Sequence, residues 1–435
     1  MRILCLTQYF NLPDQAGASR HYQFARAWAE AGHEVELLTG NVNYKTGRSI
    51  PCAPGRSYSI EDHPEGFRVR RLWCFSRFRG SFRKRLLFFG SFAANAAWVG
   101  AFARRPDVVF ASSTPLTVGI PGTLLARRFR VPFVFELRDL WPEAAVAAGV
   151  LRSAAWEART RRLARDLYHR SDHLIAVTEG IRDGILSYGV PEDRVTLVPN
   201  GVDHWMEPER FREQNPLGDF DDRFVCLYVG AHGIWNDLGT LLDAAEALRD
   251  DASVAFVFIG DGDHRAVLEE RVRQAGLPNV HFLGALPKQE AFAAVCHADL
   301  GLIAASAHEH NRQTLPNKIF DYMAAGIPVM VAAGEGEMAE LLRRSGGGWT
   351  TPPGDGRALA AEIHRVRELP PAERKAVGAR GRGHVQEHYW RPRQAARVLQ
   401  IFQGLVPVES EATKESDPHG RSCREGEPVH PAPER

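Results

Sequence analysis

The segment RILCLTQYFNLPDQAGASRHYQFARAWAEAGHEVELLTG, residues 2–40, decides the fold class. Residues 3–7 and 34–39 are short apolar runs of the length found in buried strands, and residues 19–31 between them show helical spacing. A strand, a helix and a second strand in this order are typical of a parallel sheet with helices on its faces.

The same alternation continues along the chain and restarts after residue 220. Further strands are expected at 107–111, 133–137, 173–177, 195–198, 224–229, 254–259, 280–283, 300–304 and 328–331. Helices are expected at 116–128, 238–248, 264–275, 288–297, 318–325 and 391–402. With 435 residues, 44% of them hydrophobic, the chain is long enough for two such domains. We therefore predict an α/β protein of two Rossmann-like, doubly wound domains.

The composition of residues 199–216, with three prolines and an Asn-Gly pair, is typical of a linker. We expect an amino-terminal domain at 1–200, a carboxy-terminal domain at 201–390, a helix at 391–405 packing back towards the first domain, and a disordered tail at 406–435. Because ligands of open α/β sheets bind beyond the carboxyl ends of the strands, we expect a site in a cleft between the domains.

Composition argues against several classes of protein. A net charge of +1 and the lack of a recognisable motif argue against nucleic-acid binding. The six cysteines show no metal-ligand spacing, which indicates a reducing compartment and no structural zinc. Without a signal-peptide layout or an apolar run of about 18 residues, we expect a cytoplasmic protein with no membrane-spanning helix. Peripheral contact with the inner face of the plasma membrane is left open.

Two loops of the amino-terminal half carry candidate site residues. Gly17 precedes a helix start, where amides and the helix dipole favour an anion, although an ordinary capped loop is the alternative. The loop is not a GxGxxG fingerprint, which weakens a nicotinamide or flavin hypothesis. After the strand at 133–137, Asp139 and Glu143 can accept hydrogen bonds from sugar hydroxyls, and Trp141 can stack on a sugar ring. The alternative is a local ion pair of Asp139 with the preceding arginine, with the tryptophan in the core.

Two glycine-containing turns follow strands of the second half. The amides of the first turn, residues 230–233, can face a phosphate. Its histidine, His232, can bind a phosphate or a hydroxyl, or it can simply be solvated. The second turn, residues 260–263, is typical of a tight turn near a nucleotide, and an Asp-x-Asp site for Mg²⁺ is the alternative. The candidate donor-binding residues are Gly230, His232, Gly233, Gly260, Asp261 and Gly262.

The stretch LPNKIFDYMAAGIPV, residues 315–329, carries the strongest signal. Lys318 lies in the first turn of a helix, where its charge and the amides can hold a diphosphate. Asp321 lies three residues further on the same face and can chelate two ribose hydroxyls. A plain amphipathic helix is the alternative, but it does not explain this shared face. The donor-binding candidates here are Arg312, Pro316, Asn317, Lys318 and Asp321.

Residues 77–89 interleave cations with bulky apolar side chains, a pattern that suits an anionic membrane surface. A cationic loop followed by a core helix is the alternative. The candidates for the acceptor or membrane side are Arg77, Arg79, Arg83, Lys84 and Arg85, together with Trp141 and Glu143.

These motifs together resemble glycosyltransferase family 4, whose members are retaining enzymes of GT-B fold, and in particular the WbuB-like branch that builds bacterial surface polysaccharides. The resemblance runs from residue 1 to about 402. It rests on AGHEV at 31–35, LWPE at 140–143, NGVD at 200–203, YVGAHG at 228–233 and the stretch 316–329.

The resemblance implies a UDP-sugar donor, of an N-acetylated or deoxy hexose, held by the carboxy-terminal domain. Asp321 matches the second acid of the family's Glu-x7-Glu element, but Gln313 stands at the first position. Ala231 and Asn236 stand where many members have an arginine and a lysine, so Lys318 is expected to supply the missing charge, with help from Arg312.

The resemblance further implies transfer with retention, without a metal or other cofactor. Lys318 and the amides near Gly17 and Gly233 would stabilise the leaving diphosphate, and Asp139 would orient the sugar or the acceptor. Together with the pattern at residues 77–89, the resemblance leads us to expect as partners a UDP-sugar, a glycan acceptor on polyprenyl diphosphate and peripheral contact with an anionic membrane, whereas net charge argues against nucleic acid. The alternatives are a GT-B-fold sugar-nucleotide epimerase and a catalytically silent nucleotide-sugar-binding subunit.

Overall fold

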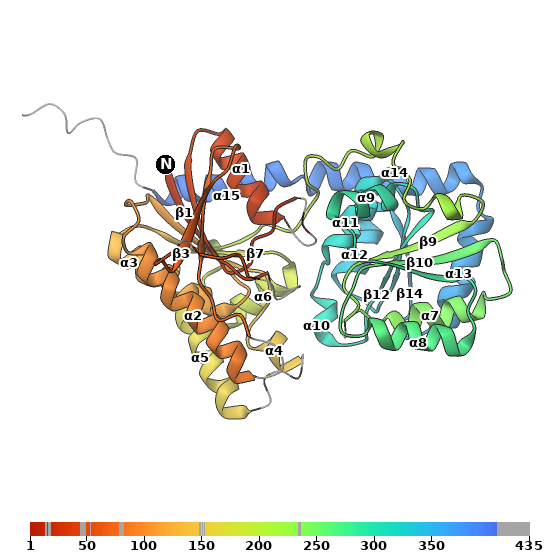
Figure 1. Ribbon diagram of the computed structural model, residues 1–435, viewed down its shortest axis with the longest axis horizontal. Helices are drawn as coiled ribbons and strands as arrows, with labels where there is room; N and C mark the ends of the chain where they lie inside the picture. Colours follow the sequence, from red (N-terminus) through yellow and green to blue (C-terminus); the bar gives the residue numbers. More distant parts are fainter. Residues whose placement is uncertain are drawn as a thin grey trace, which may run out of the picture.

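The computed structural model describes residues 1–13, 15, 19–43, 49–52, 54–77, 82–147, 149, 151, 153–233 and 236–406. These residues form two open sheets that lie side by side, each with an apolar core on both faces (Figure 1). The prediction of an α/β protein with two doubly wound domains is confirmed.

The amino-terminal sheet has eight strands in the order β3-β4-β2-β1-β5-β6-β7-β8. They are β1 (Arg2–Thr7), β2 (Glu34–Gly40), β3 (Tyr58–Asp62), β4 (Arg68–Leu72), β5 (Val108–Ser112), β6 (Phe133–Leu137), β7 (His173–Ala176) and β8 (Val195–Leu197). Neighbouring strands are parallel apart from β3 and β4. The helices of this half are α1 (Arg20–Glu30), α2 (Phe82–Gly100), α3 (Gly119–Phe129), α4 (Glu143–Ala147), α5 (Ala154–Arg170) and α6 (Glu179–Ser187).

The carboxy-terminal sheet has six parallel strands in the order β11-β10-β9-β12-β13-β14. They are β9 (Phe224–Val229), β10 (Val254–Ile259), β11 (Val280–Gly284), β12 (Leu300–Ala304), β13 (Val329–Ala332) and β14 (Gly348–Thr351). The helices are α7 (Leu238–Ala247), α8 (Arg265–Ala275), α9 (Lys288–Cys296), α10 (Glu309–Arg312), α11 (Asn317–Ala325), α12 (Glu337–Ser345), α13 (Gly356–Glu368) and α14 (Pro371–His388).

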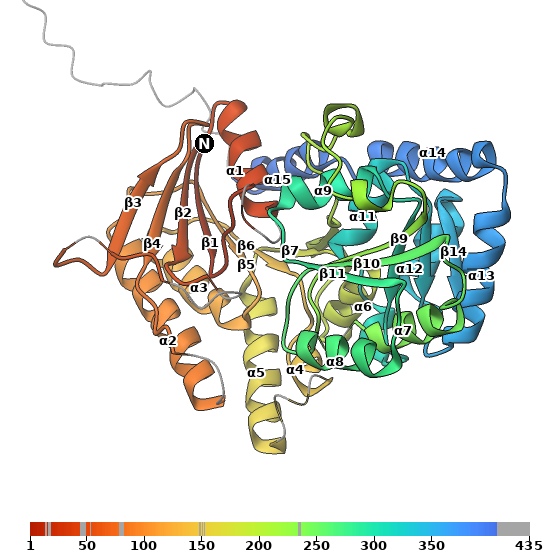
Figure 2. The same ribbon diagram turned by 45° about the vertical axis from the view of Figure 1, so that its right-hand side comes forward.

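The last described helix, α15 (Arg391–Leu405), returns to the amino-terminal domain and lies beside α1 in both views (Figures 1 and 2). The indole nitrogen of Trp28 donates a hydrogen bond to the carbonyl of Ala395 at 2.9 Å. The ring of Phe402 lies 5.3 Å from that of Trp28 and 5.6 Å from that of Phe110. The chain therefore crosses between the domains twice, once near residue 200 and once near residue 390.

Three strands were not expected from the sequence. β3 and β4 form an antiparallel hairpin at the sheet edge, where the polar residues of YSIED interrupt any apolar run. β14 has only four residues, and its burial is incomplete. Edge strands face solvent and therefore lack the continuous apolar signal of central strands. Residues 407–435, most of the expected tail, lie outside the described residues.

The strand order places a ligand-binding edge in each domain. The order reverses between β1 and β5 in the first sheet and between β9 and β12 in the second, and ligands of such sheets bind beyond the carboxyl ends at this point. The hydroxyl of Tyr322 holds β9 and β12 together there: it accepts from the amide of Val229 at 2.8 Å and donates to the carbonyl of Leu302 at 3.2 Å.

Candidate functional site

Helix α11 begins at the carboxyl ends of β9 and β12, with Pro316 as its N-cap residue. Lys318 lies in its first turn. The ammonium donates hydrogen bonds to the hydroxyl of Tyr228 at 2.8 Å and to Oδ1 of Asn236 at 2.9 Å. It also lies 4.0 Å from the centre of the Tyr228 ring, within the range of a cation–π contact. The first turn of α11 therefore presents a cation whose position is fixed by two residues from β9 and the loop after it.

Burial lowers the pKa of Lys318 to about 7, against a smaller opposing effect of Asp321. Both hydrogen-bond acceptors of the ammonium are neutral, so they offset only part of the cost of removing the charge from water. An anion beside Lys318 would restore the charged form, which is the property needed to bind a diphosphate.

Asp321 lies one turn further along α11 and is partly buried. Burial raises its pKa to about 6, and of the charges around it Lys288 lowers the pKa most while Asp203 raises it. Within the described chain no hydrogen bond reaches its carboxylate. A hydroxyl-bearing ligand would supply donors that the described residues do not.

The turns after β9 and β10 pack directly on one another. Gly230 has φ 150°, and a Cβ there would lie 2.9 Å from Nζ of Lys318. Gly260 has φ 145°, and a Cβ there would lie 1.8 Å from the carbonyl oxygen of Gly230. A Cβ on Gly262 would lie 2.4 Å from the carbonyl oxygen of His232. Gly260 and Gly262 thus allow close packing of the two turns that shape the site.

His232 is fully buried, so the alternative of a solvated loop histidine is wrong. Its ring lies among those of Tyr228, Phe258 and Phe282, and burial lowers its pKa. Neither ring nitrogen has a hydrogen-bond partner among the described residues. Asp261 is exposed, and its carboxylate accepts from the amide of the next residue at 2.8 Å. The described residues contain no group of three His, Cys, Asp or Glu side chains placed to hold a metal ion.

On the amino-terminal side, Oδ2 of Asp139 accepts a hydrogen bond from Thr114 at 2.5 Å. The salt bridges of the described chain include no ion pair between Arg138 and Asp139, so that alternative is wrong. His310 of α10 lies close enough for Asp139 to raise its pKa, although burial lowers that pKa more. Asp139 therefore faces the loop that leads into α11.

Two other predicted residues of the amino-terminal side, Glu143 and Trp141, contact residues of their own domain. Glu143 pairs with Arg161 at 2.5 Å and accepts from the hydroxyl of Tyr188 at 3.0 Å. Trp141 packs against the apolar core, as its alternative reading predicted, and its indole nitrogen has no hydrogen-bond partner in the part of the chain described. Arg77, Arg83, Lys84 and Arg85 are exposed, whereas Gly17 and Arg79 lie outside the described residues.

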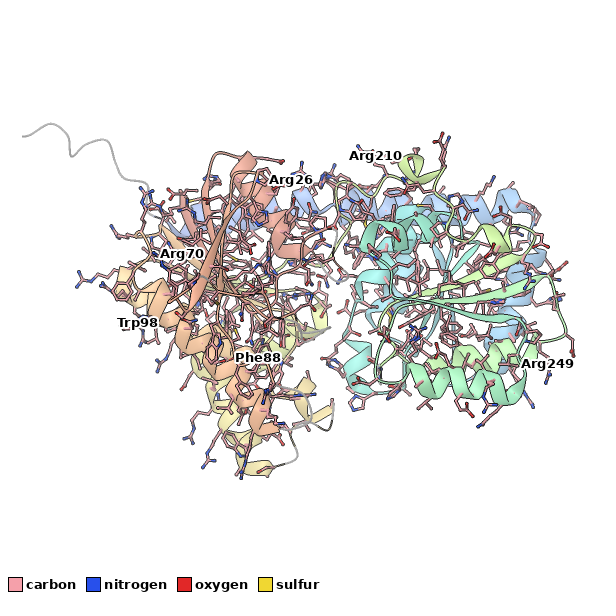
Figure 3. All side chains as sticks on the ribbon, in the orientation of Figure 1. Arg26, Arg70, Phe88, Trp98, Arg210 and Arg249 are labelled. Carbon is pink, nitrogen blue, oxygen red and sulfur yellow. The ribbon has the colours of Figure 1, made fainter. Side chains whose placement is uncertain are left out.

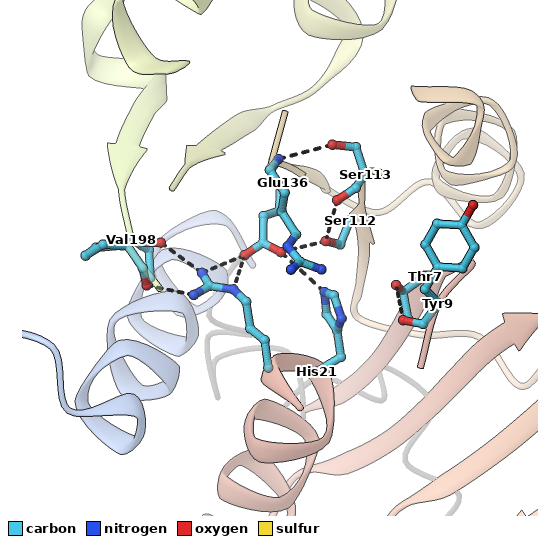
Figure 4. A network of polar contacts seen from close by, with 10 residues as sticks. Thr7, Tyr9, His21, Ser112, Ser113, Glu136 and Val198 are labelled. Atoms are coloured by element: carbon cyan, nitrogen blue, oxygen red, sulfur yellow. Dashed lines mark hydrogen bonds and ion pairs between the residues drawn. The ribbon is translucent and has the colours of Figure 1, made fainter. Parts of the chain in front are cut away.

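The structure also shows a buried ion cluster that the sequence analysis missed (Figure 4). Glu136 at the end of β6 accepts two hydrogen bonds from Arg20, at 2.9 and 2.7 Å, and one from Ser112 at 2.6 Å. His21 approaches the same carboxylate at 3.3 Å. Although burial alone would raise it, these partners hold the pKa of Glu136 well below its ordinary value. Arg20 also donates to the carbonyls of Val198 and Pro199, which fixes the start of the linker to α1.

A second missed cluster surrounds Asp203 in the linker. Its Oδ2 accepts from Ser19 at 2.6 Å and from Lys288 at 2.7 Å, and its Oδ1 pairs with Arg391 at 2.5 Å. Burial would raise its pKa, but Lys288 and Arg391 hold it well below the ordinary value. This cluster joins the N-terminus of α1, the linker, α9 and α15. In the sequence Asp203 stands out only as the last residue of the NGVD motif at 200–203.

Gln313, the residue at the first acidic position, contacts the amino-terminal domain. Its carbonyl accepts from the hydroxyl of Thr178 at 2.9 Å, and a Cβ on Gly180 would lie 2.6 Å from its own Cβ. Glu337 accepts from the amide of Gly180 at 2.9 Å. Arg312, expected to assist Lys318, is exposed and has Glu309 as its ion-pair partner at 3.7 Å.

Comparison with known proteins agrees with this geometry. The sequence profile of the Glycosyl transferase 4-like domain matches residues 16–201, and that of Glycosyl transferases group 1 matches residues 223–368. The chain is a glycosyltransferase of family 4.

Two relatives extend the similarity along the chain. It is 26% identical to WbjE of Pseudomonas aeruginosa, named as a glycosyltransferase, over 66% of this chain and 72% of WbjE. It is 25% identical to WcaI of Escherichia coli K12, named as a colanic acid biosynthesis glycosyl transferase, over 82% of this chain and 90% of WcaI. Among solved structures, HepE of Anabaena in complex with UDP and glucose matches with a TM-score of 0.69 at 18% identity, covering 93% of this chain and 100% of HepE. That likeness shows that the fold of this glycosyltransferase is GT-B.

Proposed function

We propose that this glycosyltransferase moves an N-acetylated or deoxy hexose, with retention, from a UDP-sugar to a glycan acceptor carried on polyprenyl diphosphate, in the synthesis of a bacterial surface polysaccharide. The observation that supports the donor site is the pair on α11: a cation fixed by Tyr228 and Asn236, and a carboxylate one turn later that accepts no hydrogen bond from the described residues. The UDP complex of HepE and the name of WcaI support the donor and the product class.

In the proposed mechanism, Lys318 and the free amides at the start of α11 bind the diphosphate. Asp321 binds the ribose hydroxyls. The bond from the anomeric carbon to the diphosphate oxygen breaks while the acceptor oxygen bonds to the same face of the carbon. The acceptor proton passes to the departing diphosphate. Lys318 lowers the barrier because negative charge grows on the leaving group in the transition state.

Asp139 orients the sugar or the acceptor from the opposite domain, and no metal takes part. Because Lys318 and the amides at the start of α11 supply the positive charge for the diphosphate, chelation of divalent metal should leave UDP binding unchanged.

Ligand-induced thermal shift tests the donor site. UDP at about 100 times its Kd should stabilise the protein by about 2.7 kcal/mol, with EDTA present or absent, and GDP and ADP should do less. Asp321→Asn and Lys318→Met should abolish the shift, whereas Asp250→Asn and Lys375→Met, at exposed positions, should keep it. No shift with UDP in the native protein would contradict the proposal and favour a silent subunit. Conversion of a UDP-sugar to an isomer without acceptor would favour an epimerase.

A further inference from the structure

Helix α2 is apolar on the side that faces away from the protein as well as on the side that faces the core. Residues 86–103, LLFFGSFAANAAWVGAFA, contain no charged side chain. Phe88, Phe92 and Ala96 are buried against the sheet, but Leu87 is 57% exposed and Trp98 is 67% exposed. A surface helix normally carries polar residues on its outer face, so this pattern indicates a surface that is covered in use.

The apolar surface continues beyond α2. Phe102, in the turn after the helix, is 70% exposed, and its ring lies 5.2 Å from that of Trp98. Leu124 on the adjacent helix α3 is 52% exposed. In Figure 3, Trp98 lies at the outer edge of the amino-terminal domain and points away from it, while Phe88 lies under the same helix. We call the surface formed by Leu86, Leu87, Trp98, Phe102 and Leu124 the α2–α3 face.

Unpaired cations flank the α2–α3 face. Arg83, Lys84 and Arg85 are exposed at the start of α2, and Arg127 and Arg128 are exposed on α3. None of the ion pairs between described residues includes these five side chains. From residue 66 to residue 135 the sequence has thirteen Lys and Arg but one carboxylate, that of Asp107. Four of these cations, Arg68, Arg70, Arg71 and Arg104, pair with acids outside this stretch, so the excess of positive charge lies with the others, the five exposed cations among them.

We propose that the α2–α3 face binds peripherally to an anionic lipid bilayer, with the apolar side chains in the interfacial layer and the five cations near lipid phosphates. Exposed aromatic and aliphatic residues with a cationic border are the composition of interfacial membrane anchors. No helix among the described residues is long and apolar enough to cross a bilayer, so the contact is with one surface. A second copy of the chain does not fit, because pairing two such faces would bring like charges together.

The position of α2 relates the membrane contact to the proposed reaction. This step of the inference rests on the proposed function. The chain leaves the sheet towards α2 at the carboxyl end of β4, which runs parallel to β2 and β1. That edge of the sheet is the one that carries Asp139 and faces the donor domain. A polyprenyl-linked acceptor held in the same bilayer would therefore reach the site from the cationic end of α2.

Vesicle flotation tests the contact with the full chain. The protein should float with vesicles of phosphatidylcholine and phosphatidylglycerol and stay unbound with phosphatidylcholine alone. Trp98→Ser combined with Phe102→Ser should weaken the partition coefficient at least tenfold, since interfacial anchoring scales with the apolar area that is buried. Arg83→Gln with Lys84→Gln and Arg85→Gln should weaken it by a similar factor and reduce its dependence on salt, which Arg127 and Arg128 would still cause in part.

The matched controls are Val267→Ser, at a 71% exposed position on α8, and Arg249→Gln with Lys375→Gln, all in the carboxy-terminal domain. These should bind as the native protein does. Equal flotation of the native protein and both α2 variants would overturn the proposal. It would also be overturned if light scattering showed that the native protein is a dimer and that the double variant Trp98→Ser, Phe102→Ser is a monomer. The UDP-induced thermal shift should be unchanged in every one of these variants. Failure of that shift in the native protein would count against the donor site and leave membrane binding standing.

Discussion

Glu136 in the amino-terminal domain and Asp321 in the carboxy-terminal domain are both acidic residues removed from much of the solvent, and their surroundings differ. Glu136 has Arg20, His21 and Ser112 as partners and remains charged. Asp321 has no hydrogen-bond donor in the described chain, and its pKa rises to about 6. The carboxylate of Glu136 is satisfied within the protein, whereas that of Asp321 is the one proposed above to bind a ligand. Substitutions at these two carboxylates and around them test this contrast.

Glu136→Gln should reduce the free energy of unfolding by about 3–5 kcal/mol, because it leaves the buried guanidinium of Arg20 without a counter-charge. Urea unfolding measures this loss. Glu143→Gln, which breaks a partly exposed pair with Arg161, is the control and should cost about 0–1 kcal/mol. If the two variants lose the same stability, Glu136 does not have the structural role assigned to it.

Lys318→Met should lower kcat/KM by about 10²–10³, the usual cost of removing one group that stabilises charge in a transition state. Its thermal midpoint should not fall, because the native lysine is already held at a cost shown by its lowered pKa. Steady-state release of UDP measures the effect, with Lys375→Met as the control. A kcat/KM close to that of the native enzyme would remove Lys318 from the site.

UDP affinity should be greatest between about pH 6 and pH 7. Above about pH 7 Lys318 loses its proton, and below about pH 6 Asp321 gains one, so the affinity should weaken by up to tenfold per pH unit on each side. Calorimetry across pH should show that Lys318→Arg loses the alkaline limb and keeps the acidic limb. An alkaline limb that survives in Lys318→Arg would mean that another group titrates.

The same two shifts predict the stability of the free protein. The folded pKa of Asp321 lies above its unfolded value, so its contribution to stability falls as pH rises from about 4 to about 6. The folded pKa of Lys318 lies below its unfolded value, so its contribution rises from about pH 7 to about pH 10. Asp321→Asn and Lys318→Met should each remove one of these slopes.

Gly180→Ala should have the smallest effect, a roughly three- to tenfold rise in KM for the donor. The new Cβ would overlap Gln313 across the domain contact, and the domains can separate slightly to relieve it. Gln313→Gly in the same chain should recover most of the loss. Gly404→Ala, where a Cβ meets no neighbour, is the control. An unchanged KM in Gly180→Ala would show that this contact does not affect the donor site.

The fold followed closely from the sequence where strands are central and apolar. The expected strands at 224–229, 254–259 and 300–304 coincide with β9, β10 and β12. The hairpin of β3 and β4 did not follow, because at a sheet edge the pairing of strands replaces burial as the source of stability.

The candidate site followed less completely. Lys318 and Asp321 were found because three-residue spacing puts both on one helical face. Their partners were not, because Tyr228 and Asn236 precede Lys318 by 90 and 82 residues. Asn236 stands where many family members have a lysine, which suggests a missing positive charge. In the structure its Oδ1 instead accepts a hydrogen bond from Lys318 and positions that ammonium group.

The two α/β domains, the helix with its cation and carboxylate, and the glycosyltransferase family all follow from the amino-acid sequence. These depend on periodicity and short motifs, which act over a few residues. The tertiary structure decided which charges are satisfied: it buried His232, paired Glu143 with Arg161, gathered Lys288 and Arg391 on Asp203, and left the outer face of α2 apolar. Hydrogen bonds, burial and pKa shifts arise between residues far apart in the chain, so they exist only once the chain has folded.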